Sequence, residues 1–191
     1  ANFSWDFSTL EPDSQRIDTF FSVGSTPALY QLYFNNPFLY PNYNASYAKR
    51  GLEISVPPTV ALTEVFNYIK NSSAAFNNVG FGANINGLPA SVQNDPIDKE
   101  YEFPLNYTNG TTSITSLSEF ELTVPTIGYY GQDVERITTV DGWGTLTLPN
   151  GTYNVLRIKS VLNKIDTISI TTPFPFATTL PRPEEIEYKW L

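Results

Sequence analysis

The chain carries many hydroxyl groups but little that could activate them. A serine or threonine becomes a nucleophile only beside a positioned base, and the 191 residues include no histidine and no cysteine. One Ser-x-x-Lys spacing runs from Ser46 to Lys49. Enzymes that use this spacing also carry Ser-Asp-Asn and Lys-Thr-Gly motifs, which the sequence lacks. We therefore interpret Lys49 as a solvated surface lysine.

A pair of carboxylates offers a second route to catalysis. Asp133 and Glu135 are two positions apart in a β-branched segment, which would place them on one strand face about 7 Å apart. Glycosidases hold two carboxyl groups roughly 5–10 Å apart. However, no neighbouring apolar residues predict the pocket that would raise one pKa. The sequence therefore predicts no catalytic residue and a non-enzyme, with a glycoside-active enzyme as a distant alternative.

Oxygen ligands for a cation gather between positions 94 and 100. Asp95, Asp98 and Glu100 fall in this segment, and Ca²⁺ accepts carboxylate and carbonyl oxygens. The spacing is not that of an EF-hand, and an Asx-rich turn explains these residues equally well. Zinc and copper sites favour the cysteine and histidine that are missing. The hypothesis is therefore no cofactor, or Ca²⁺ at these three residues.

Aromatic residues give the best lead to a binding site. Tyrosines alternate with asparagines in a stretch punctuated by proline. Aromatic rings can stack on sugars, while amides supply both donors and acceptors to hydroxyl groups. The alternative is that this loop packs its own rings against the domain. The predicted glycan contacts are Tyr40, Asn42, Tyr43, Asn44 and Tyr47.

The charge balance excludes some partners. The chain has 11 basic and 19 acidic residues, a net charge of −8, and no basic run. Nucleic acid and anionic lipid both attract clusters of lysine and arginine. Also missing is an apolar run of the roughly 18 residues needed to span a membrane. We expect neither nucleic-acid binding nor membrane insertion.

The clearest structural element is a hairpin near the C-terminal third. Thr145–Leu148 alternates polar and apolar residues, Pro149-Asn150-Gly151 follows, and Thr152–Val161 returns. Asn-Gly is the strongest short hairpin signal, because both positions tolerate positive φ, so Gly151 should adopt one. Alternation predicts a single inward face. Its members are Leu146, Leu148, Leu156 and Ile158, joined by Trp143 if a bulge or bend occurs near Gly144.

Other segments complete an all-β pattern. Asp133–Val140 reads as a strand ending in an Asp141-Gly142 turn, and Val65–Ile85 reads as a hairpin, although 57–71 also fits a helical period. Further predicted strands are Trp5–Phe7, Leu52–Val56, Glu100–Leu105, Ser118–Val124, Asp166–Thr171 and Glu185–Trp190. The prolines at 173–183 suggest a loop across a sheet edge. We predict one domain, 1–191, an antiparallel β-sandwich or flattened barrel of about ten strands with little helix.

Four blocks of sequence carry a resemblance to a known family. They are Trp5–Ser8, Phe103–Tyr107, Val140–Lys159 and Ile186–Leu191, and the Asp-Gly-Trp-Gly-Thr-Leu run from Asp141 is the specific part. Together they resemble a family of secreted Bacteroidetes proteins of unknown function. Its members typically carry a signal peptide and a C-terminal type IX secretion sorting domain. The resemblance implies export from a bacterial cell, and it transfers no catalytic residue.

Two functions from different classes follow from these observations. The first is a secreted or cell-surface, non-catalytic binding or adhesion module with a polysaccharide as the favoured ligand. The alternative is a purely structural or partner-docking domain of a larger surface protein. An exposed aromatic platform would favour the first function. Fully buried aromatics and a flat polar surface would favour the second.

Overall fold

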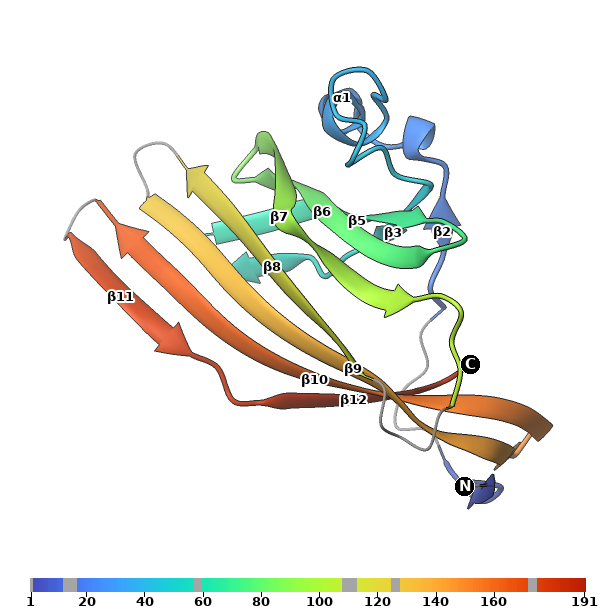
Figure 1. Cartoon of the computed structure of the whole chain (residues 1–191). Helices are drawn as coiled ribbons and strands as arrows, with labels where there is room; N and C mark the ends of the chain where they lie inside the picture. The colour runs from blue at the N-terminus through green and yellow to red at the C-terminus, as the bar shows by residue number, and fades with distance from the viewer. Residues whose placement is uncertain (1, 12–16, 57–59, 108–112, 125–127, 172–174) are drawn as a thin grey trace.

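The chain folds into two β-sheets packed face to face, with one short helix (Figure 1). The computed structural model describes residues 2–11, 17–56, 60–107, 113–124, 128–171 and 175–191. Strands account for 67% of the structure and helix for 6%. These values confirm the predicted all-β sandwich with little helix. Within the described residues, no helix is long and apolar enough to cross a membrane.

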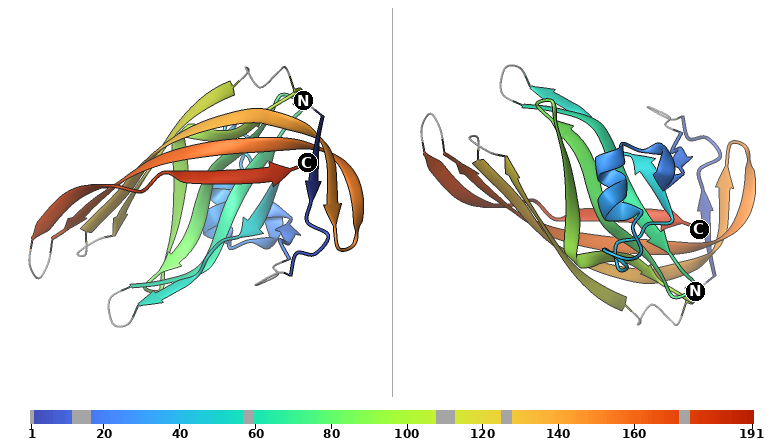
Figure 2. Two further views of the ribbon diagram at one scale, coloured as in Figure 1. Left: turned by 90° about the horizontal axis from the view of Figure 1, so that it is seen from below. Right: turned by 90° about the horizontal axis from the view of Figure 1, so that it is seen from above.

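One sheet, here called the long sheet, is built around a hairpin that sweeps across the whole molecule (Figures 1 and 2). The edge of β9 pairs with β8 and β1, and the edge of β10 pairs with β11 and β12. Among the described strands of this sheet, only β1 runs parallel to its partner. The strands are β1 (Asn2–Asp6), β8 (Ser113–Val124), β9 (Gly128–Leu148), β10 (Gly151–Ile170), β11 (Phe176–Pro181) and β12 (Glu185–Trp190).

The second sheet, here called the short sheet, has the order β2-β3-β5-β6-β7, with β4 also paired to β5. Its strands are β2 (Phe20–Phe21), β3 (Tyr47–Arg50), β4 (Ile54–Val56), β5 (Val60–Asn71), β6 (Ala75–Ile85) and β7 (Leu88–Glu102). A 3-10 turn, Val23–Ser25, and the helix α1, Ala28–Phe34, follow β2. The β5–β6 pair confirms the predicted 65–85 hairpin.

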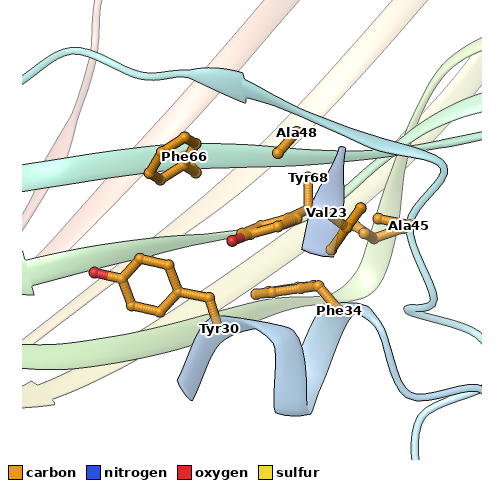
Figure 3. Packing of buried hydrophobic residues seen from close by; sticks show 8 residues of the cluster. Val23, Tyr30, Phe34, Ala45, Ala48, Phe66 and Tyr68 are labelled. Carbon is orange, nitrogen blue, oxygen red and sulfur yellow. The ribbon is translucent and has the colours of Figure 1, made fainter. Parts of the chain in front are cut away.

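Helix α1 packs on the face of the short sheet that points away from the long sheet (Figures 1 and 3). The ring of Phe34 stacks on that of Tyr68 with centroids 4.1 Å apart. The Tyr68 hydroxyl donates to Thr26 Oγ1 at 2.9 Å. Tyr30 lies over Gly82, where a Cβ atom would come within 2.5 Å of the ring. Glycine in β6 therefore lets the helix approach the sheet closely.

Apolar side chains fill two regions between the sheets. One contains Val65, Ala83 and Ile85, with Leu122 of β8 packed against them. The other contains Tyr101, Val140 and Ile158, with Leu156 packed against them. Burial of these side chains supplies the main force that holds the sheets together.

The predicted turn at Asp141-Gly142 is wrong, because β9 continues through it. Arg157 pairs with Gly142 and the next residue, Ile158, pairs with Val140, so Asp141 is the extra residue of a β-bulge. A bulge therefore does occur near Gly144, but three residues earlier in the chain. The predicted positive φ of Gly151 is confirmed at 154°.

The register of the hairpin, in which Leu148 pairs with Gly151, also corrects its predicted core face. Paired residues of adjacent strands share a face, and Leu146 pairs with Tyr153 while Leu156 pairs with Trp143. Leu146 and Leu148 therefore lie on the outer face, opposite to Leu156 and Ile158. Leu146 is still buried, but Trp143 is 44% exposed, so its predicted burial is wrong.

Helix α1 and strand β11 are among the described elements that were not predicted. Helix α1 has seven residues, too short to show a helical period in the sequence. The strand β11 occupies Phe176–Pro181, where the prolines suggested a loop. It lies at the sheet edge, where a proline is tolerated because no neighbouring strand needs its missing N–H.

Candidate functional site

The tyrosines predicted to contact a glycan are each packed against other rings. Tyr40 stacks on Tyr33 with centroids 5.1 Å apart. Tyr47, in β3, meets the ring of Phe20 edge-on at 4.8 Å. Tyr43 packs against the core beneath α1, and burial raises the pKa of its hydroxyl. All three side chains are half-buried, so this segment contributes its rings mainly to packing.

The two asparagines of the same segment differ in environment. Asn42 is exposed, and its backbone carbonyl accepts a hydrogen bond from Lys70 Nζ at 3.2 Å. Asn44 is half-buried, and its side-chain Oδ1 has no hydrogen-bond partner within the described structure. The five predicted contact residues thus lie between the end of α1 and the first residue of β3 without forming a continuous platform.

The three acidic residues considered for Ca²⁺ lie along β7 with different partners. Asp98 is buried and accepts two hydrogen bonds from Arg136, each at 3.0 Å. Glu100 lies 3.5 Å from Lys189 Nζ, and Asp95 is exposed. Among the described residues, no group of three or more acidic side chains could hold a metal ion. The geometry therefore does not bring these three carboxylates together.

The carboxylate pair of β9 lies on the outer face of the long sheet. Glu135 accepts a hydrogen bond from Asn163 at 2.9 Å. With Asp133 it borders a shallow depression of about 350 Å³ that also includes Leu117 and Ile165. Asp133 and Leu117 are exposed, so the pair remains close to solvent. Such a surface does not supply the enclosed apolar site that would raise the pKa of a general acid.

A different group of aromatic residues forms a continuous surface, which we call the aromatic face. It spreads over the outer side of the β9–β10 hairpin, with contributions from both ends of the chain. Phe3 stacks on Trp5 at 5.3 Å, and Trp190 meets both Trp5 and Phe7 edge-on at 6.2 and 5.9 Å. Its members are Phe3, Trp5 and Phe7 of the N-terminal segment and Tyr188 and Trp190 of β12.

Strand pairing explains why these rings meet. β1 pairs with one side of the hairpin and β12 with the other, so their outward side chains converge across it. Between them, β9 presents Gly142. A Cβ atom there would lie 3.0 Å from the ring of Phe3 and 3.2 Å from that of Trp5. The missing side chain therefore lets these two rings lie against the backbone.

An ion pair lies within the aromatic face. Arg157 donates from Nε and Nη2 to the two carboxylate oxygens of Asp141, each at 2.9 Å. Its guanidinium carbon is 5.1 Å from the ring centroids of both Trp5 and Tyr188. These contacts hold a charged donor and a charged acceptor in fixed positions beside the rings.

The aromatic face remains open to solvent. Phe3 is 39% exposed, Phe7 is 36% and Tyr188 is 46%. The sequence signal for it was present in the spacing Phe3, Trp5, Phe7 and again in Ile186, Tyr188, Trp190. Each run places its aromatic residues on one strand face. The sequence does not show that these two runs are neighbours in the fold. The predicted contacts were therefore placed at 40–47, where tyrosines are close together in the sequence.

Comparison with protein-family models, with curated proteins and with solved structures gives no significant match. The resemblance to secreted Bacteroidetes proteins therefore stays a prediction.

Proposed function

We propose that the protein is a non-catalytic binding module that acts outside a bacterial cell and binds a polysaccharide through the aromatic face. The observation that carries this proposal is the convergence of five rings beside the Arg157–Asp141 pair. Single exposed apolar residues are ordinary, but a contiguous exposed group marks an interaction surface.

The chemistry of the aromatic face suits a sugar. The C–H faces of a pyranose ring are apolar and pack on aromatic rings, which releases ordered water. Hydroxyl groups at the ring edge both donate and accept, so they complement Arg157 and Asp141 together. Because the ion pair and strand pairing already hold these groups, little side-chain entropy is lost on binding.

The net charge of the protein favours a neutral glycan. A charge of −8 repels an anionic polysaccharide. Binding of a neutral chain depends on stacking and hydrogen bonds, which salt screens only weakly. We therefore expect the dissociation constant to change less than about twofold between 50 and 500 mM NaCl.

The test is a glycan-array screen with and without Ca²⁺, followed by calorimetry on each hit. The double variant Phe3→Ala/Tyr188→Ala removes two exposed rings and leaves the ion pair intact. We expect it to weaken binding at least tenfold, which corresponds to about 1.4 kcal/mol. Phe38→Ala is the matched control, because Phe38 is a 93% exposed ring outside the aromatic face. It should leave the affinity unchanged.

Two outcomes would contradict the proposal in different ways. If the array finds no bound glycan, the structural or partner-docking domain becomes the leading explanation. If a glycan binds and the double variant retains full affinity, the site lies elsewhere. The triple variant Tyr40→Ala/Tyr43→Ala/Tyr47→Ala would then test the segment between α1 and β3.

A further inference from the structure

A polar cavity of about 260 Å³ lies between the two sheets, where a sandwich normally has apolar core. The short sheet contributes Asn67, Asn78 and Asn94 from three neighbouring strands. The long sheet contributes Gln132 of β9 and Lys164 of β10. Polar groups are thus aimed inward from both sides.

An ion pair forms one wall of this cavity. Asp98 and Arg136 bond through two hydrogen bonds of 3.0 Å, and their side chains are only 9% and 10% exposed. Burial alone would lower the pKa of Arg136, but the hydrogen bonds to Asp98 and the charges of Asp98, Glu100 and Glu187 together outweigh burial and raise it. Replacing a buried ion pair by apolar residues is often neutral or stabilising. Stability alone therefore does not explain the pair.

Hydrogen-bonding capacity remains open around the cavity. Glu187 Oε2 is buried without a hydrogen-bond partner in the described part of the chain. It lies 3.5 Å from Arg136 Nη1 and 3.6 Å from Lys189 Nζ. The oxygen is therefore ion-paired but accepts no hydrogen bond from the described residues, and a buried acceptor without one is costly. A hydroxyl group placed in the cavity would complete this set of donors and acceptors.

We propose that the cavity binds one small, neutral, polyhydroxylated molecule of monosaccharide size. The volume falls just below the roughly 300 Å³ at which pockets for drug-sized ligands begin, so it suits a single ring. The charged groups of the lining are already paired, Arg136 with Asp98 and Glu187 and Lys164 with Glu185, which favours an uncharged ligand.

Two further features fit that ligand class. Carboxamides both donate and accept, as hydroxyl groups do. Phe81 and Phe120 line the same cavity and meet edge-on at 5.2 Å, which provides an apolar wall for the C–H groups of a sugar. The site is separate from the aromatic face, because it lies between the sheets and not on the outer side of the long sheet. It therefore does not rest on the proposed polysaccharide binding.

The experiment is a titration of ¹⁵N-labelled protein with glucose, galactose, mannose or N-acetylglucosamine up to about 50 mM, a concentration that detects millimolar affinity. We expect at least one sugar to shift the side-chain amide signals of Asn67, Asn78, Asn94 and Gln132 to saturation. Asn67→Ala should weaken that binding about tenfold. Asn163→Ala, an exposed amide on the opposite face of β10, should leave it within twofold.

Other outcomes would overturn the proposal. If none of the four sugars shifts these amides, the cavity is not a monosaccharide site. If the shifts fall on the indole groups of Trp5 and Trp190, the sugar binds the aromatic face and the cavity proposal fails while the polysaccharide proposal stands. Phe3→Ala/Tyr188→Ala should leave cavity binding intact. If Asn67→Ala fails to fold, the signals that shift in the unsubstituted protein still show whether the sugar binds in the cavity.

Discussion

Removing either partner of the buried Asp98–Arg136 pair should destabilise the protein much more than replacing both. The charged groups are 3.0 Å apart, and both side chains are about nine-tenths buried. With an effective dielectric constant of 20, the attraction at this distance is about 5–6 kcal/mol. Arg136→Met alone leaves the buried carboxylate of Asp98 without its cation, and Asp98→Leu alone leaves buried Arg136 with only the more distant Glu187. We expect each to cost about 3–5 kcal/mol of unfolding free energy.

The double variant Asp98→Leu/Arg136→Met removes both charges together. It should lie within about 1 kcal/mol of the unsubstituted protein, or be more stable by up to about 4 kcal/mol. Urea unfolding at pH 7, followed by tryptophan fluorescence, measures all four members of the cycle. Lys99→Met is the control, because the Lys99–Glu102 pair is exposed and should contribute about 0–1 kcal/mol.

Two results would refute this reasoning. Single variants that cost less than about 1 kcal/mol would show that the pair is not effectively buried. A double variant as unstable as the sum of the single variants would show that each side chain contributes separately. If the double variant is stable but no longer binds a monosaccharide, the pair is retained for the cavity and not for the fold.

The region beneath α1 supplies the remaining predictions. Tyr30→Phe should leave stability unchanged or raise it by about 1–3 kcal/mol, because the buried Tyr30 hydroxyl has no hydrogen-bond partner in the described residues. Tyr68→Phe loses a hydrogen bond to Thr26 and should cost about 0.5–1.5 kcal/mol in the same urea measurement; equal losses in both variants would contradict the assignment. Burial raises the pKa of Tyr30 to about 12, against about 10 in the unfolded chain. The unfolded state therefore loses its proton first, so the stability contributed by Tyr30 should be full below pH 10 and fall by up to about 3 kcal/mol between pH 10 and 12. That fall should be smaller in Tyr30→Phe. Gly82→Val places a Cβ within 2.5 Å of the Tyr30 ring and should cost about 1–3 kcal/mol; an unchanged melting temperature would show that α1 can move aside.

Local signals in the sequence were enough to predict the two hairpins. Asn150-Gly151 supplies backbone positions that tolerate positive φ, and the flanking alternation continues in β9 and β10. Val65–Ile85 was ambiguous between a helix and a hairpin. The residues Asn71-Ser72-Ser73 are typical of a turn and favour the hairpin, which β5 and β6 confirm. Both predictions depended on residues close together in sequence.

Features set by distant residues were not predictable in the same way. The aromatic face joins Trp5 to Trp190, and no local pattern shows that β1 and β12 flank one hairpin. The cavity depends on Asp98 of β7 meeting Arg136 of β9. In the sequence, Asp98 suggested a calcium ligand, because its partner in the opposite sheet could not be identified.

The bulge at Asp141 connects the failed prediction of a turn at Asp141-Gly142 with the candidate binding site. In a regular strand, Gly142 would share the inner face with Val140, and Trp143 would point outward. The extra residue exchanges the faces on which Gly142 and Trp143 lie. Gly142 therefore lies beneath the rings of Phe3 and Trp5, whereas Trp143 pairs with inward-facing Leu156. It also places Asp141 where it binds Arg157. Bulges commonly redirect side chains beside functional sites, and here one irregularity both provides space for the rings and positions the charged pair among them.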